Sequence, residues 1–287
     1  MPDGQLWLMV ACAVHVPLAL AAVLPRVMSE EEERVWTVLC RLWFPAAVGL
    51  LISFLLKPGT WAVVAAVPWF LFAGLVGAFG VDFTWRHRRG GPWHEVLLGF
   101  AAAYFAGSAI WLLAQRGGWA LLGFEEPWVT WTAAHFLVLG TSTLVVAAVM
   151  GRVFPQSARH RVMAFLLAAG LPCTALGIQY QFAWLERIGA WISLLAVSWL
   201  AIEMLIHRYT LYGWRRRALD LAALSALTGM GFALSYTLRI WLEWEWPSLE
   251  FMANWHAGLN ACGFGILALA AVATRAAGEG DRPPVSH

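Results

Sequence analysis

Two histidines inside long apolar segments are the residues of this chain best placed to do chemistry. His135 lies in the run VTWTAAHFLVLG and is the only ionisable residue from Trp128 to Val149, and His256 lies in the run NWHAGLN. An apolar segment of that length crosses a hydrocarbon layer of about 30 Å as one helix, so an ionisable side chain within it is paired, hydrated or functional. Imidazole gives and takes protons near neutral pH, so the two histidines predict an acid/base pair.

Further polar residues are predicted at the same level. Asn260 follows His256 by one helical turn and shares its face. Tyr236, Arg239 and Glu243 share a face near the end of the preceding apolar segment. We expect Asn260 and Tyr236 to orient the reacting group, and Arg239 to stabilise charge with Glu243 as its partner.

Three more residues complete the predicted binding site, namely Trp131, Thr132 and Gln179. Structural interpretations compete with each functional one. His256 and Asn260 could form interhelical hydrogen bonds in a seam of small residues, and Arg239 with Glu243 could be an ion pair at the membrane interface. The convergence of these polar residues on one leaflet favours a functional site.

The composition is that of a multi-pass membrane protein. Of the 287 residues, 61% are hydrophobic and 13% charged, with a mean hydropathy of +0.67, which leaves too few charges to coat a soluble domain of this size. The net charge of +2 does not indicate a nucleic-acid partner, and membrane lipids are the expected surroundings. The four cysteines lie in apolar segments without C-x-x-C spacing, which argues against disulfides and thiolate metal sites.

The predicted fold class is all-α, a polytopic membrane helix bundle. Apolar windows near 20 residues, separated by charged or Pro/Gly positions, predict about nine transmembrane helices. Their ranges are 6–24, 35–56, 61–81, 94–114, 128–149, 162–178, 188–206, 218–241 and 251–272. We expect a single transmembrane helical domain over 1–274 and a disordered cytoplasmic tail over 275–287.

The basic residues give this topology an orientation. Of the 19 Lys and Arg residues, fourteen follow the odd-numbered segments, four follow the even-numbered segments and Arg41 lies inside the second. The fourteen are Arg26, Arg34, Arg86, Arg88, Arg89, Arg152, Arg159, Arg161, Arg208, Arg215, Arg216, Arg217, Arg275 and Arg282. By the positive-inside rule the N-terminus is predicted outside and the C-terminus in the cytoplasm, with the protein in the cell inner or plasma membrane.

A second polar group is predicted near the cytoplasmic side. Glu95 opens the fourth segment and His207 ends the seventh, where each complements a helix dipole. Arg41 could snorkel or pair with Glu95 or Glu203, so we interpret this group as structural. His15, in the middle of the first segment, has no obvious partner in the sequence.

Three stretches resemble the YndJ-like family of bacterial integral membrane proteins. They are KPGTWAVVAAVPW at 57–69, TAAHF at 132–136 followed by Gly151-Arg152, and MANWHAGLNACGF at 252–264. The family tends to show H-F-H in the fifth segment, whereas this chain has His135-Phe136-Leu137, so the second histidine is absent. The resemblance implies a multi-pass membrane protein, and members are often labelled transporters.

Three functions remain open from the sequence. The first is a non-redox acid/base enzyme, of isomerase, cyclase or ring-opening type, acting on a lipophilic small molecule without a cofactor or metal. The second is a small-molecule transporter or export component, against which the sequence shows no polar trail across mid-bilayer. The third is haem binding between the two histidines. A closed apolar cavity around His135 and His256 would favour the enzyme, and a polar channel reaching Glu203 would favour transport.

Overall fold

The computed structural model describes residues 8–22, 29–87, 93–153, 158–207 and 211–278. Within these ranges the chain forms helices and no β-strand, so the all-α prediction is confirmed. Eight helices are long and apolar enough to cross a membrane, and a shorter apolar helix covers Leu8–Ala22.

Each predicted segment corresponds to a helix or a continuous run of helices. The six uninterrupted spans are α3 (Glu30–Leu55), α4 (Thr60–His87), α5 (Trp93–Gly117), α8 (Ala158–Gln179), α9 (Ala183–Ile206) and α10 (Gly213–Leu242). The capping box in which Ser29 and Glu32 bond each other's backbone N–H starts α3, so part of the acidic run at 30–33 is a helix cap.

Three further runs contain π-helical segments. The first is η1 (Ala11–His15) followed by α2 (Val16–Ala22). The second comprises α6 (Trp128–His135), η2 (Phe136–Ser142) and α7 (Thr143–Val153). The third comprises α11 (Leu249–Gly258), η4 (Leu259–Ile266) and α12 (Leu267–Gly278). A π-helical turn bonds i to i+5, as the Val16 N–H does to the Ala11 carbonyl, and such turns are frequent at functional sites.

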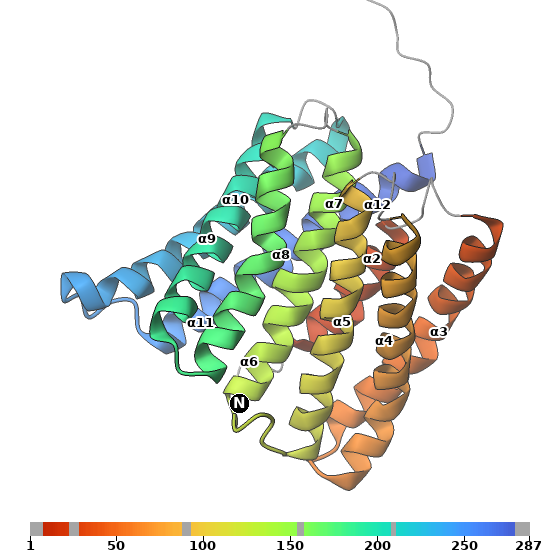
Figure 1. Cartoon of the computed structure of the whole chain (residues 1–287), viewed down its shortest axis with the longest axis horizontal. Helices are drawn as coiled ribbons and strands as arrows, with labels where there is room; N and C mark the ends of the chain where they lie inside the picture. The colour runs from red at the N-terminus through yellow and green to blue at the C-terminus, as the bar shows by residue number, and fades with distance from the viewer. Residues whose placement is uncertain (1–7, 23–28, 88–92, 154–157, 208–210, 279–287) are drawn as a thin grey trace, which may run out of the picture.

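The spans form one bundle around the α6–η2–α7 helix, the most buried of the long spans. Figure 1 shows α3 and α4 at one side and α9 with α10 at the other, while the tip of the α10–α11 hairpin projects beyond the bundle. α5 packs along all three parts of the central helix, and α12 packs against α2 and α10. The bundle buries its apolar core along the central helix and leaves many large apolar side chains exposed on its outer helices, as expected for a surface in contact with lipid.

The antiparallel order brings the ends of α4 and α7 and the starts of α8 and α10 to one end of the bundle, as Figure 1 shows. We call this the basic end, because these helix ends carry Arg86, Arg152, Arg159, Arg161 and Arg215. Five of the fourteen residues used for the orientation lie outside the described residues, namely Arg26, Arg88, Arg89, Arg208 and Arg282. The predicted tail is helical as far as Gly278, and its remaining part, 279–287, also lies outside them.

At the opposite end, Arg116 fastens α5 to α3. Its guanidinium donates to the carbonyls of Ser53 at 2.8 Å and Leu56 at 2.6 Å, at the C-terminus of α3. The last carbonyls of a helix lack intrahelical donors and attract positive charge. This buried arginine is therefore a helix cap between two spans.

Candidate functional site

His135 and His256 face each other across the interface of two spans. Their ring centroids are 6.4 Å apart with an angle of 30° between the planes. His135 ends α6 and His256 lies in α11, so each ring is carried just before a π-helical segment. The two predicted imidazoles therefore share one location.

Hydrogen bonds fix the tautomer of both rings. His135 Nδ1 is 2.7 Å from the Trp131 carbonyl, and His256 Nδ1 is 2.9 Å from the Gly229 carbonyl of α10. A carbonyl oxygen only accepts, so each Nδ1 carries a proton and, in the neutral ring, each Nε2 holds a lone pair. Within the described part of the chain neither Nε2 has a hydrogen-bonding partner, so both are available to a bound molecule.

Asn260 stands one turn from His256, as predicted. Its Nδ2 donates to the His256 carbonyl at 2.7 Å and lies 3.3 Å from the ring Nδ1. The close approach of α10 depends on Gly229, because an added Cβ there would lie 2.6 Å from Asn260 Nδ2. The absence of a side chain at Gly229 therefore allows its own carbonyl to approach α11 closely enough to accept from His256 Nδ1.

The pair lies at an open face of the bundle rather than in a closed cavity. His135 is exposed and His256 is half-buried, and the two pockets described below lie against other helices. Neither of these two pockets encloses the pair, so the closed apolar cavity that would favour an enzyme over a transporter is not one of them. The tip of the α10–α11 hairpin projects beyond the bundle (Figure 1).

The residues predicted to stabilise charge lie elsewhere. The Arg239 guanidinium lies 4.4 Å from the centre of the Tyr236 ring in a cation–π contact. The expected ion pair between Arg239 and Glu243 does not form, because α10 ends at Leu242 and Glu243 turns into a left-handed conformation with φ 53°. Arg239 follows Gly229 by ten residues, so it lies ~15 Å further along the helix, towards the projecting tip.

The remaining predicted contacts divide in the same way. Trp131 is next to the pair, since its carbonyl accepts from His135, and Thr132 donates to the Trp128 carbonyl at 2.7 Å. Gln179 ends α8, and no described contact joins it to either histidine. The structure thus brings together His135, His256, Asn260 and Trp131 and separates them from Arg239, Glu243 and Gln179.

His15, for which the sequence offered no partner, joins three spans in the centre of the bundle. Its Nδ1 is 2.9 Å from Ser142 Oγ in η2, and its Nε2 donates to the Ala261 carbonyl in η4 at 2.6 Å. The ring is fully buried and packs on Gly265, where an added Cβ would overlap the imidazole. The three π-helical segments therefore meet at one histidine.

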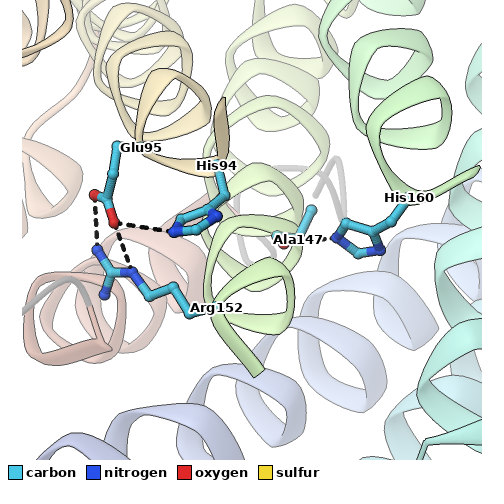
Figure 2. Close-up of polar contacts among 5 residues, drawn as sticks. All are labelled: His94, Glu95, Ala147, Arg152 and His160. Carbon is cyan, nitrogen blue, oxygen red and sulfur yellow. Dashed lines mark hydrogen bonds and ion pairs between the residues drawn. The ribbon is translucent and has the colours of Figure 1, made fainter. Parts of the chain in front are cut away.

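A third polar group lies at the basic end and is shown in Figure 2. The fully buried carboxylate of Glu95 accepts from Arg152 Nε and Nη2, each at 2.9 Å, and His94 Nε2 lies 3.4 Å from the same carboxylate. His160 bonds the Ala147 carbonyl at 3.1 Å, and the Trp93 ring contacts both His94 and His160. We call His94, Glu95, Arg152 and His160 the Glu95 cluster.

The sequence left two possibilities for Arg41, snorkelling or pairing with Glu95 or Glu203, and the structure does not show the pairing. Arg41 is exposed on α3 and does not contact Glu95 or Glu203. Glu203 instead accepts from Trp199 at 3.1 Å and pairs with His207 at 3.2 Å. The partner of Glu95 is Arg152, for which the sequence indicates only a place in a basic loop. The pairing could have been predicted from position, because Arg152 follows the end of the fifth apolar segment and Glu95 opens the fourth, at the same end of the bundle.

Within the described ranges, no group of three or more His, Cys, Asp or Glu side chains is arranged to hold a metal ion. All four cysteines are free thiols. The site is thus a pair of histidines, accompanied by two separate polar groups, one at His15 and one at the Glu95 cluster. His15, which the sequence places in the middle of its segment, forms a polar contact with Ser142 in the centre of the bundle.

Comparison with known proteins assigns the chain to a family. The sequence profile of the YndJ-like protein family matches residues 6–264, nearly the whole chain. No curated protein and no solved structure shows significant similarity to it. The match fits the multi-pass helical fold and assigns no role to any residue, and on its extent the chain belongs to the YndJ-like family.

Proposed function

We propose that this membrane protein is a non-redox acid/base catalyst for a lipophilic small molecule, with His135 and His256 as the groups that move protons. The observation that carries the proposal is the facing pair of rings, 6.4 Å apart, each with Nδ1 fixed by a carbonyl and Nε2 unoccupied. Such an Nε2 can remove a proton from a bound substrate, and the imidazolium formed can return it to another atom.

The reaction class follows from this proton balance. One Nε2 takes a proton from carbon or oxygen of the substrate, a bond shifts within the substrate, and a proton is delivered at the new position by the same or the facing imidazole. No electrons leave the molecule, so isomerisation, cyclisation and ring opening are the reactions that fit. We expect Asn260 and the backbone around Trp131 to orient the substrate beside the rings.

The open face supports a substrate that arrives from the bilayer. His135 is exposed where the helix is long and apolar enough to lie at membrane depth, so a molecule dissolved in lipid reaches Nε2 without crossing the bundle. A water-soluble substrate would have to enter past the apolar outer surface. The inner or plasma membrane is the setting that we propose, with the basic end in the cytoplasm.

The test compares lipid extracts and culture medium of cells that lack the protein with those of cells that express it, by mass spectrometry. We expect a species of altered structure that depends on the protein, and His135→Ala or His256→Ala should lower its formation by about 10²–10⁴-fold. His87→Ala is the matched control, because His87 Nδ1 also bonds a carbonyl one turn back, Phe83 at 2.9 Å, but lies on α4. Unchanged product in both site variants at normal abundance would refute the proposal.

A proton-coupled transporter is the second candidate, and one observation favours it. The helix that carries His135 also carries Ser142, bonded to His15, and Arg152 of the Glu95 cluster, so polar groups occur at three levels along one span. Histidine and carboxylate chains of this kind form proton relays in membrane pumps. In the same experiment a transporter would move an unaltered molecule between cells and medium, without a new species.

A further inference from the structure

A partly open apolar pocket with a cavity volume of about 50 Å3 lies between α2, α3, α4 and α5. Its walls include Val76 and Phe79 of α4 and Ala101 of α5, and it reaches Thr141 and Val145 of the central helix. The Thr141 hydroxyl is occupied, because it donates to the Phe136 carbonyl at 3.1 Å. The pocket therefore suits part of a hydrocarbon chain.

One of the residues that line the pocket has a buried polar atom without a hydrogen-bonding partner. Trp36 of α3 is 5% exposed, lines the pocket and contacts the Phe79 ring at 5.4 Å between centroids. Its Nε1 is buried and donates to no acceptor in the described part of the chain. A buried donor without an acceptor costs about 1–3 kcal/mol, so an occupant that brings an oxygen acceptor would be stabilised there.

A second pocket adjoins the first at Phe79, which lines both. It lies between the start of α3 and the end of α4 and contains Glu31, Glu32, Asp82 and Arg86. Arg86 pairs with Asp82 at 2.8 Å, so three carboxylates stand against one guanidinium. This excess of negative charge favours a cationic group, while Arg86 can also meet an anionic one.

We propose that these pockets bind one phospholipid whose head group carries a primary ammonium. The acyl chain occupies the apolar pocket, an ester carbonyl accepts from Trp36 Nε1, the ammonium lies near Glu31 and the phosphate near Arg86. The two charges of the head group thus each meet a charge of opposite sign, and the acyl chain contacts the apolar wall of the first pocket. This site is separate from the histidine pair and does not depend on its chemistry.

Native mass spectrometry of the full chain in detergent tests the site, using an equal mixture of phosphatidylethanolamine and phosphatidylglycerol with identical acyl chains. We expect phosphatidylethanolamine to be retained preferentially. Glu31→Gln should reduce that preference by about two- to fivefold, because it removes one exposed charge interaction. Equal retention of both lipids by the unaltered chain would refute the head-group assignment.

Two further variants test the apolar pocket. Ala101→Phe fills it and should abolish retention of either lipid, whereas Ala103→Phe, an exposed position on the same helix, should leave retention unchanged. Trp36→Phe keeps an aromatic ring but removes the donor, and should weaken retention about tenfold without lowering abundance. If Ala101→Phe fails to accumulate, Trp36→Phe decides alone: retention equal to that of the unaltered chain would overturn the proposal.

Discussion

The histidine pair and the Glu95 cluster are built from the same residue types but differ in how completely their hydrogen-bonding groups are used. His135 and His256 each bond through one nitrogen and leave Nε2 free at an accessible face. In the cluster, both oxygens of Glu95 are held by Arg152, and the carboxylate is fully buried. A free, accessible base can react, whereas a saturated, buried ion pair mainly holds helices together.

His15 lies between these extremes. It is as buried as Glu95, yet it is uncharged when Nε2 donates to Ala261 and Nδ1 accepts from Ser142. The comparison therefore predicts a graded response: removing a side chain should cost most stability in the Glu95 cluster, less at His15 and least in the histidine pair.

The largest effect is expected for Arg152→Ala. This substitution leaves the Glu95 carboxylate buried without its cation and should lower the free energy of unfolding by about 3–5 kcal/mol. The measurement is unfolding of the purified protein in a mild detergent, compared with Arg161→Ala, an exposed basic residue on the next helix. Adding Glu95→Gln to Arg152→Ala should recover part of the loss, and absence of any loss would mean that the ion pair is not structural.

An intermediate effect is expected for His15→Ala, which removes two buried hydrogen bonds and opens a cavity beside Gly265. We expect a loss of about 2–3 kcal/mol in the same unfolding measurement. Ser142→Ala removes one of the two bonds without the cavity and should cost about 1 kcal/mol. A His15→Ala protein as stable as the unaltered chain would contradict the junction between the three spans.

The smallest effect on stability is expected for His135→Ala. The bond from its Nδ1 to Trp131 lies within one helix at an accessible face, so its loss should cost less than about 1 kcal/mol. Combined with a loss of product, this result would assign His135 to function rather than folding. A loss of stability as large as that of Arg152→Ala would instead mean that His135, like the Glu95 cluster, mainly holds the helices together.

The sequence predicted the spans well because membrane helices follow length, hydropathy and the distribution of basic residues. It also predicted that His135 and His256 would meet, because both lie at similar depth in segments that enter from the same end. The pairing of charges was harder. Arg152 reaches Glu95 from the end of a segment, while Arg41, inside a segment, is exposed, since side-chain direction depends on rotation about each helix axis.

The rotation of each helix about its axis could not be predicted from the sequence. The segments that become η1, η2 and η4 are mostly apolar, and no proline lies within them to mark the change from α to π geometry. The partners of His15 are a serine hydroxyl and a backbone carbonyl, which have no distinctive sequence signature. Glu243 was assigned to a helical face that ends one residue earlier, at Leu242.

The π-helical segment η2 separates His135 from Arg152 on a single span. A bulge of one residue changes the angular phase of everything beyond it by about 100°, one step of an ordinary helix. Before η2 the His135 imidazole faces α11, and after η2 the Arg152 guanidinium contacts α5. Dropping a single residue from this stretch would leave both halves helical while turning one of the two groups towards the wrong neighbour.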